Sequence, residues 1–343
     1  MSLVLGLLLC SFLITGVLII PFIHVLYKLR FLRQTQETRD MFGVLTPIFD
    51  QFHKHKAGTP VGGGLLIVFF VSFLFMISFP ALSYLGVSIT QVYPLFGELQ
   101  VIFFTFISFA MLGLYDDIKK FFGFSKTGIF GLKVRHKLGI QIVLATISAW
   151  ILYSGLGISF INIPFFGAID LGILYVPFAV FTIVSFANAV NITDGLDGLA
   201  SGTLLFCLFG LWFISAAILD TTLSIFLGLW IGALLAFLYF NIYPARIWLG
   251  DVGALSFGAT LAVVGLLLGK VIALGVIGGI FVAEILSSLA QILSKKFRGK
   301  KLMPASPFHL WLQYVGWEEP KIVQRALMTG IALTLFGVWL TLL

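Results

Sequence analysis

Five aspartates stand in three polar segments of an otherwise apolar chain, and their shared oxygen chemistry points to a function. In chain order they are Asp116, Asp117, Asp194, Asp197 and Asp251. No thiolate pair or multi-histidine cluster accompanies them in the sequence. Ligand sets made only of oxygen suit Mg²⁺, which proteins usually bind through one or two carboxylates together with substrate phosphates. The pattern therefore predicts a magnesium-dependent site that handles phosphorylated molecules.

Basic residues near these aspartates strengthen the prediction of a phosphate-handling site. They are Lys56, Lys119, Lys120, Lys133 and Lys137. Ammonium groups bind polyphosphates well. The sequence contains no GxxxxGK[ST] loop, which argues against ATP hydrolysis. Phosphoryl transfer is the reaction class that this set of residues favours.

The glycine-rich segment 56–64 reads Lys-Ala-Gly-Thr-Pro-Val-Gly-Gly-Gly. Glycines and a proline before a helix expose backbone N–H groups that can bind an anion, with Lys56 and Thr59 beside them. A flexible loop that merely starts a helix explains the same composition equally well. Taken alone, the segment leaves both interpretations open.

Asp116 and Asp117 lie at what we expect to be the C-terminus of a helix. A carboxylate there opposes the helix dipole at a cost of about 0.3–1 kcal/mol, and two adjacent carboxylates also repel each other. The start of a solvated loop would tolerate them. The unfavourable placement nevertheless favours a role as metal ligand or general base.

The segment 188–198 reads Asn-Ala-Val-Asn-Ile-Thr-Asp-Gly-Leu-Asp-Gly. Asp194 and Asp197 share one face if a helix begins here, because they are spaced i and i+3. The alternative is ordinary capping, with Asp194 as N-cap and Asp197 in the first turn. Asn188 and Asn191 add further polar groups, and this density exceeds what a single cap needs.

Two further segments contain residues that could do chemistry. In segment 241–253, Asp251 either caps the following helix or binds a hard cation. Trp248 either anchors the chain at the membrane interface or stacks on a nucleobase. The last polar segment carries His309 ahead of Gly316-Trp317-Glu318-Glu319. A lone histidine is more often structural than catalytic.

The composition places all these segments in a membrane protein. Hydrophobic residues make up 60% of the 343 residues and charged residues 10%, a balance that no soluble domain needs. A membrane-spanning helix takes about 20 apolar residues. Apolar runs predict ten spans, near residues 3–27, 61–82, 98–115, 138–156, 174–190, 198–218, 223–240, 254–268, 271–294 and 325–343. The predicted fold is therefore all-α and polytopic, with residues 1–343 forming one integral membrane domain.

The distribution of basic residues orients these spans. Segments 28–60, 116–137, 241–253 and 295–325 contain 20 of the 21 lysines and arginines, and only Lys270 lies elsewhere. In a ten-span protein with both termini outside, all four segments face the cytoplasm, as the positive-inside rule requires. The rule also accounts for the net charge of +7 without a nucleic-acid partner. We therefore expect the active site on the cytoplasmic face.

One expected span, 271–294, differs from the others. Gly275, Gly278 and Gly279 predict a bend or break in it, and Glu284 is the one ionisable residue that clearly falls near the membrane midplane. A transporter that uses intramembrane carboxylates is the alternative from another functional class. Such a protein should bury several ionisable residues at that depth, and the sequence places its carboxylates at helix ends instead.

Together and in this order, the polar segments resemble those of the polyprenyl-phosphate N-acetylhexosamine-1-phosphate transferases. The similarity extends from about residue 50 to 325. It rests on Lys56-Ala-Gly-Thr-Pro60 with Gly62-Gly63, Asp116-Asp117-Ile-Lys-Lys120, Lys137 with Gln141, Asn191-Ile-Thr-Asp-Gly-Leu-Asp-Gly198, Asn241 with Pro244-Ala245 and Gly250-Asp251, and Gly316-Trp317-Glu318. Most of these pieces are short, but jointly with the helix count they are highly specific.

The resemblance implies a UDP-linked amino sugar as donor, polyprenyl phosphate as acceptor, UMP as leaving group and Mg²⁺ as cofactor. The implied metal ligands are Asp251 and Asp194. Asp116 and Asp117 would lie beside the acceptor phosphate, with Asp116 as the base in a direct attack. A multi-pass location in a bacterial cell membrane and a possible homodimer are also implied.

The resemblance further assigns two sets of residues. The catalytic set is Asp116, Asp117, Lys120, Asp251 and His309. The substrate-binding set is Lys56, Thr59, Lys137, Asn188, Asn191, Asp194, Asp197, Asn241 and Trp248. In the second set, Trp248 occupies the position at which the family has an aromatic residue that stacks on uracil.

One departure from the family pattern concerns the loop around His309. The muramoyl branch of the family has three successive histidines followed by Phe and Glu before Gly-Trp, whereas this chain reads His309-Leu-Trp-Leu-Gln313. The loop lies near the sugar and phosphates of the donor in the family, so the sugar and peptide of the donor stay open. The Gly-Thr-Pro motif favours the muramoyl branch, which makes the first lipid-linked intermediate of peptidoglycan. The N-acetylglucosamine branch is the alternative, and the retained motifs argue against an inactive relative or a polyprenyl-diphosphate phosphatase.

Overall fold

Apolar helices dominate the computed structural model, which describes residues 2–33, 52, 56–87, 89–122 and 131–343. The helices are α1 Ser2–Lys28, α3 Gly63–Tyr84, α4 Leu95–Phe121, α5 Val134–Trp150, α6 Tyr175–Thr193, α7 Leu199–Ala217, α8 Thr221–Asn241, α9 Gly250–Leu267, α10 Val271–Ile277, α11 Gly279–Arg298, α12 Phe308–Tyr314 and α13 Glu319–Thr341. Within the described residues, nine helices are long and apolar enough to cross a membrane, and the pair α10 and α11 makes a tenth span if it counts as one. The prediction of an all-α polytopic fold with about ten spans is confirmed.

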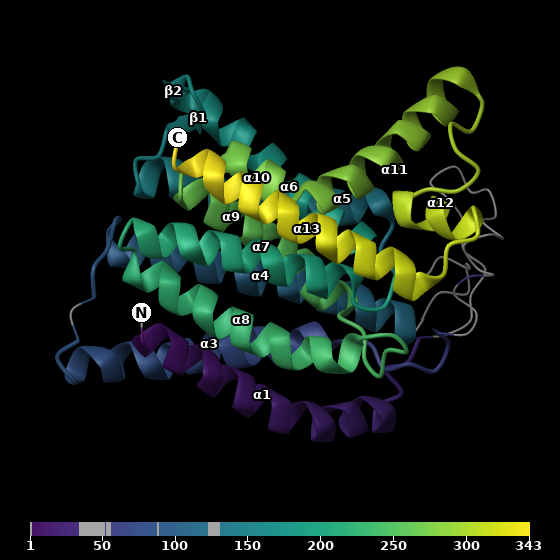
Figure 1. Cartoon of the computed structure of the whole chain (residues 1–343), viewed down its shortest axis with the longest axis horizontal. Helices are drawn as coiled ribbons and strands as arrows, with labels where there is room; N and C mark the ends of the chain where they lie inside the picture. Colours follow the sequence, from purple (N-terminus) through teal and green to yellow (C-terminus); the bar gives the residue numbers. More distant parts are fainter. Residues whose placement is uncertain (1, 34–51, 53–55, 88, 123–130) are drawn as a thin grey trace.

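The predicted break in the ninth expected span is also confirmed. α10 and α11 meet at Gly278 with a bend of 83°. A Cβ atom on Gly278 would lie 2.8 Å from the ring of Phe186 and 3.1 Å from the carbonyl oxygen of Leu274, so the backbone passes too close to its neighbours for a side chain. After the bend, α11 leans away from the other helices toward the end of the bundle that carries α12 (Figure 1).

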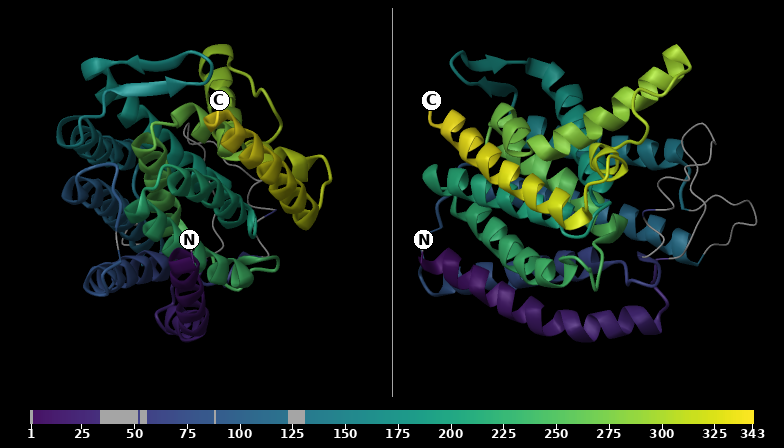
Figure 2. Two further views of the ribbon diagram at one scale, coloured as in Figure 1. Left: turned by 60° about the vertical axis from the view of Figure 1, so that its left-hand side comes forward. Right: turned by 45° about the vertical axis from the view of Figure 1, so that its right-hand side comes forward.

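The connection between α5 and α6 forms a short antiparallel hairpin. Strands β1 Phe160–Ile163 and β2 Gly167–Asp170 pair so that Phe160 lies opposite Asp170. The hairpin is the only sheet among the described residues. It lies at the same end of the bundle as both chain termini (Figures 1 and 2).

α9 is the buried centre of the bundle, packed against α4, α6 and α3. Small residues allow these helices to approach closely, which is the usual basis of helix packing in membranes. A Cβ atom on Gly113 of α4 would lie 2.2 Å from the carbonyl oxygen of Asp251, and one on Gly64 of α3 would lie 2.2 Å from the Cα of Gly253. The backbones of three helices therefore meet at the N-terminus of α9.

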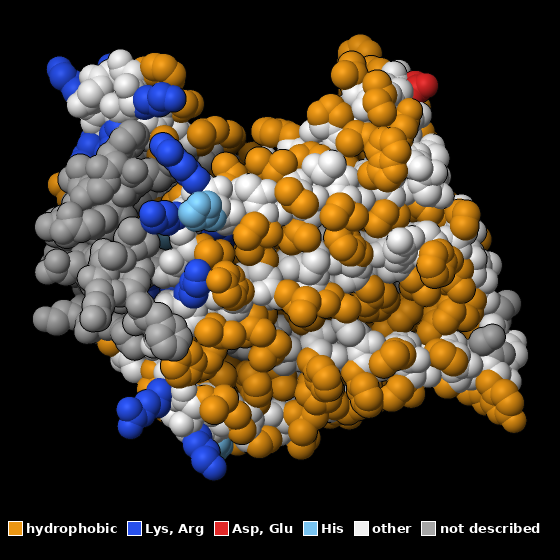
Figure 3. Space-filling model, turned by 180° about the vertical axis from the view of Figure 1, so that it is seen from behind, with side chains coloured by type: hydrophobic (Ala, Val, Ile, Leu, Met, Phe, Trp, Pro, Cys, Tyr) orange, Lys and Arg blue, Asp and Glu red, His pale blue; other side chains and the backbone are white. Residues whose placement is uncertain are grey.

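The two ends of the bundle differ in charge. Both termini lie at one end, whereas α12 and the C-terminal end of α4 lie at the other (Figures 1 and 2). In the view of Figure 3, lysine and arginine side chains gather at this second end and hydrophobic side chains cover the middle of the bundle. The described basic residues of this end include Lys120, Lys133, Arg135 and Lys137.

The close contact of α4 with α9 yields a stability prediction. We expect Gly113→Ala to destabilise the protein by about 1–3 kcal/mol, the usual cost of overpacking a tight interior, because the added methyl group would overlap the backbone of Asp251. Thermal unfolding in detergent micelles measures the effect. Gly6→Ala is the matched control, since nothing lies within 4 Å of a Cβ atom at Gly6. Equal unfolding temperatures for the two variants would contradict the prediction.

Candidate active site

Side chains from four helices converge at the charged end of the bundle to form what we call the carboxylate–lysine cluster: Asp116 and Lys120 of α4, Lys137 of α5, Asn191 of α6 and Asp251 of α9. Lys120 Nζ lies 3.1 Å from Asp116 Oδ2 and 2.8 Å from Asp251 Oδ1. Lys137 Nζ lies 3.1 Å from Asp116 Oδ2 and also pairs with Asp251 Oδ2. Asn191 Nδ2 donates a hydrogen bond of 3.1 Å to Asp251 Oδ1. Residues up to 135 positions apart in the sequence thus form one network.

The neighbouring Asp117 has a different environment from Asp116. Asp117 Oδ2 accepts a hydrogen bond of 3.1 Å from the backbone N–H of Val252, in the first turn of α9. Its carboxylate opposes the dipole of its own helix but lies at the favourable N-terminal end of another. A Cβ atom on Gly250, which has φ +77°, would lie 2.8 Å from Asp117 Oδ2. The placement that is unfavourable within α4 is therefore compensated by α9.

The cluster fits a divalent cation by its donor chemistry. The carboxyl groups of Asp116 and Asp251 contact the ammonium groups of Lys120 and Lys137, and that of the neighbouring Asp117 lies 3.9 Å from Lys120 Nζ. All the acceptor atoms are oxygens, as Mg²⁺ prefers. In the described part of the chain, no group of three or more His, Cys, Asp or Glu is placed to hold a metal ion by itself. Mg²⁺ needs no such group, because substrate phosphates and water commonly fill most of its coordination shell.

Asp194 and Asp197 do not cap α7, so the capping interpretation is wrong. α7 begins at Leu199 behind Gly198, which has the left-handed φ of +78°, and Asp194 instead ends α6. The half-buried Asp194 lies at this helix end, outside the spans. Burial raises its pKa well above the usual range; Arg33 opposes the shift and Asp251 adds to it. Asp194 is therefore electrostatically coupled to the cluster.

A buried ion triad joins three distant parts of the chain. Lys56 Nζ lies 2.5 Å from Glu319 Oε1 and 3.1 Å from Asp197 Oδ1. Glu319 Oε1 also accepts a hydrogen bond of 2.6 Å from the backbone N–H of Asp197. Asp197 Oδ2 accepts another, of 2.9 Å, from the backbone N–H of Ala245. Lys56 and Asp197, both predicted to bind substrate, thus also hold the protein's own segments together. Glu319, which the sequence marked only as part of the segment from Gly316 to Glu319, completes the triad.

The asparagines predicted to bind substrate differ in their partners. Asn241 is 2% exposed; its side chain accepts from Ser201 Oγ at 2.5 Å and donates to the carbonyl of Ile247 at 2.9 Å. Asn188 pairs with Gln141, and its Nδ2 donates to Gln141 Oε1 at 2.7 Å. Asn241 thus braces the turn before α9, and Asn188 ties α6 to α5, whereas Asn191 contacts the cluster directly.

Trp248 is buried beneath two cations. Its side chain is 3% exposed, and the guanidinium of Arg33 and the ammonium of Lys56 lie 4.6 Å and 4.7 Å from the ring centroid. The backbone N–H of Trp248 donates a hydrogen bond of 2.8 Å to the carbonyl of Pro60. Thr59, half-buried, lies in the same segment. Because the side chain is almost fully covered, a base can stack on this indole only if one of the groups that cover it moves away.

His309 belongs to a separate buried pair that faces the Asp194 loop. Glu284 Oε1 accepts from the backbone N–H of His309 at 3.1 Å, and Glu284 Oε2 lies 3.0 Å from His309 Nδ1. The other ring nitrogen packs against Gly195, where a Cβ atom would come within 2.4 Å of Nε2. Glu284, the carboxylate expected at the membrane midplane, therefore positions the histidine.

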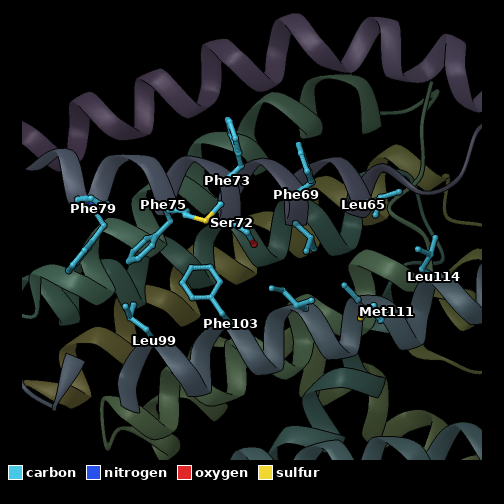
Figure 4. A pocket seen from close by; sticks show the side chains of 15 residues that line it. Leu65, Phe69, Ser72, Phe73, Phe75, Phe79, Leu99, Phe103, Met111 and Leu114 are labelled. Atoms are coloured by element: carbon cyan, nitrogen blue, oxygen red, sulfur yellow. The ribbon is translucent and has the colours of Figure 1, made fainter. Parts of the chain in front are cut away.

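An apolar groove of about 640 Å³ lies between α3 and α4. Phe69 and Phe73 of α3 and Phe103 and Met111 of α4 line it (Figure 4). Such a surface suits a hydrocarbon chain. The α4 residues that line the groove form one stripe along the helix, which ends at Leu114. Asp116 follows two residues later and therefore points about half a turn away from this stripe, to the opposite side of α4. It is therefore separate from the carboxylate–lysine cluster.

Comparison with known proteins adds an independent observation. Residues 99–269 match the glycosyl transferase family 4. A phospho-N-acetylmuramoyl-pentapeptide-transferase from Clostridium perfringens (strain 13 / Type A) is 34% identical over 313 residues, which cover 90% of this chain and 89% of that protein. The proteins of the same name from Caldanaerobacter subterraneus subsp. tengcongensis and Orientia tsutsugamushi (strain Ikeda) are each 36% identical, over 82% and 83% of this chain and 84% and 80% of their own.

The ion triad yields a second stability prediction. We expect Lys56→Met to cost about 3–5 kcal/mol, the usual effect of leaving buried charges without their partner. Denaturant unfolding in detergent micelles measures the change. Lys321→Met removes a lysine from the exposed start of α13, and its unfolding curve should match that of the unaltered protein. If the two variants unfold alike, the triad does not stabilise the fold.

Proposed function

The chain belongs to the phospho-N-acetylmuramoyl-pentapeptide-transferases within glycosyl transferase family 4, and from this premise we propose that it transfers phospho-MurNAc-pentapeptide from a UDP-linked donor to polyprenyl phosphate. The protein is a multi-pass membrane phosphotransferase. In the proposed reaction an oxygen of the acceptor phosphate attacks the β-phosphorus of the donor. The bond between that phosphorus and the bridging oxygen breaks, and UMP leaves with the electron pair. The product is a lipid-linked diphosphate sugar.

The observation that carries this proposal is the carboxylate–lysine cluster. Two phosphate-bearing substrates repel each other, and a site that joins them must offset their charge. Lys120 and Lys137 supply ammonium groups that touch both Asp116 and Asp251. Phosphate oxygens arriving between these groups would replace carboxylates as partners of the lysines.

Asp116 is the better candidate for the base that takes the proton of the acceptor phosphate. Its Oδ2 faces both lysines of the cluster, where a phosphate would bind. Each aspartate has one oxygen held by the backbone: Asp116 Oδ1 by the N–H of Leu132 at 2.6 Å and Asp117 Oδ2 by the N–H of Val252 at 3.1 Å. The second oxygen of Asp117 lies 3.9 Å from Lys120 alone, so Asp117 serves mainly to fix the position of α9. In this scheme the acceptor attacks directly, and no covalent link to the protein forms.

Asp251 and Asp194 are the proposed ligands of the cofactor. Bound Mg²⁺ would polarise the donor phosphates and offset their negative charge. Asp251 contributes to the raised pKa of Asp194, and a cation held by both carboxylates would relieve this repulsion. Asn191 orients Asp251 through its hydrogen bond, and Glu284 orients His309 toward the loop that carries Asp194.

The charged end of the bundle is the proposed cytoplasmic end. Membrane proteins keep Lys and Arg on the cytoplasmic side, and the donor is a charged nucleotide that does not cross the bilayer. Both termini lie at the opposite end (Figure 1). This orientation brings the acceptor phosphate and the soluble donor to one surface.

The donor can be identified by direct assay. We expect the purified protein to release UMP when it is given polyprenyl phosphate, Mg²⁺ and UDP-MurNAc-pentapeptide. The reason is that the carboxylate–lysine cluster holds the carboxylates and ammonium groups that the proposed reaction uses. A parallel reaction with UDP-GlcNAc tests the sister branch of the family, since the loop at His309 departs from the muramoyl pattern. Release with UDP-GlcNAc alone would move the protein to that branch. Release with neither donor would refute the transferase proposal.

The role of Asp251 is tested by substitution. We expect Asp251→Asn to lower turnover by at least about 100-fold, the scale on which removal of one charge-stabilising group acts, while the protein folds as before. Asp170→Asn is the control, because Asp170 lies exposed in the hairpin at the other end of the bundle. Full activity of Asp251→Asn at every Mg²⁺ concentration would exclude this residue as a metal ligand.

A further inference from the structure

Backbone hydrogen bonds place Arg33 beside the indole of Trp248. The Arg33 N–H donates to the carbonyl of Thr59 at 3.0 Å, and the carbonyl of Arg33 accepts from Gly58 N–H at 2.8 Å. The same segment joins Trp248 through its hydrogen bond to Pro60. Three segments that are far apart in the sequence thus run side by side as short extended pieces. Their pairing, rather than a chance side-chain rotamer, brings the guanidinium over the ring.

The two cations over the indole are held very differently. Lys56 is 4% exposed and forms ion pairs with Glu319 and Asp197 at 2.5 Å and 3.1 Å. No ion pair within 4.0 Å links Arg33 to a carboxylate among the described residues. Its described side-chain contact is the ring of Trp248, at 4.6 Å. Arg33 is therefore the cation that can leave the ring without breaking an ion pair of the described site.

The electrostatic environment of Arg33 favours an anionic partner. Burial lowers the pKa of the guanidinium, and the attraction of Asp194, Asp197 and Glu319 does not fully offset that effect. Arginine stays protonated in any case. A phosphate close to the guanidinium would form bidentate hydrogen bonds and compensate the buried charge.

The indole itself carries a second sign of a ligand. Trp248 Nε1 is buried and has no hydrogen-bond partner in the described part of the chain. Buried N–H groups are nearly always paired, so an isolated one calls for an explanation. An acceptor atom on a ligand that reaches this indole would pair it.

We propose that Arg33 is a donor-binding residue whose guanidinium lies over Trp248 and moves to the diphosphate of the UDP-sugar when uracil stacks on the indole. This inference rests on the proposed function, because it assumes a uridine donor at Trp248. Arg33 then replaces a cation–π contact with a charge-assisted pair to phosphate, which is the stronger interaction. The residue thereby couples recognition of the base to recognition of the phosphates.

The test compares ligands that share a base and differ in phosphate. Calorimetry measures the binding of uridine, UMP and UDP to the full chain in detergent micelles, for the unaltered protein and for Arg33→Gln. We expect Arg33→Gln to weaken the binding of UMP and UDP by about 10–100-fold, the effect of losing hydrogen bonds to a charged group. The affinity for uridine should stay the same. Arg33→Lys should recover part of the loss, because it restores the charge without the planar fork. Arg30→Gln, an exposed change in the same segment, controls for net charge.

Each outcome decides between alternatives. If Arg33→Gln weakens the binding of uridine and UMP equally, Arg33 has a structural role and the inference is overturned. Unchanged UMP affinity, or equal weakening by Arg30→Gln, would also overturn it while leaving the proposed function in place. If the unaltered protein binds neither UMP nor UDP, the proposed donor site and the role of Arg33 fall together.

Discussion

The close approach of α4 and α9 is the constraint on which the candidate site depends. No side chain separates the two helices at Gly113, where a Cβ atom would lie 2.2 Å from the backbone of Asp251. This contact brings Asp117 to the first turn of α9 and sets Asp116 and Asp251 against the same two lysines. Carboxylates that are unfavourable at the end of one helix are stabilised by the beginning of another. A larger residue at Gly113 would separate the groups that the proposed chemistry needs together.

The charged side chains of the site are paired with groups of opposite charge. Lys120 and Lys137 pair with carboxylates, and Lys56 pairs with Glu319 and Asp197. Taking ions out of water is costly, and pairing offsets that cost. Substrate phosphates and a cation would therefore exchange partners with groups that are already ionised and positioned. Such an arrangement suits transfer between two anionic substrates, because ammonium groups that can pair with their phosphates are already in place.

Local rules succeeded for the helices and partly failed for the polar loops. The apolar runs predicted the spans, and three glycines predicted the break that the structure shows at Gly278. The capping interpretation of Asp194 and Asp197 was wrong, because α7 starts later and Asp197 bonds Ala245 instead. Glu319 was named only as part of a polar segment, with no role assigned, and Arg33 was not singled out at all. The partner of Glu319 lies 263 residues away, and a cation over Trp248 becomes visible only once distant segments are paired.

The sequence by itself determined the membrane architecture, the end of the bundle that collects charge, and the chemistry of the site in terms of residue types. It could do so because the bilayer acts on each apolar run separately, and because short motifs carry their own donors and acceptors. Only the tertiary structure decided which charged groups meet. Lys56 and Glu319 are 263 residues apart, and Lys137 and Asp251 are 114 apart. Distances of that kind depend on how the helices pack, and no local pattern contains them.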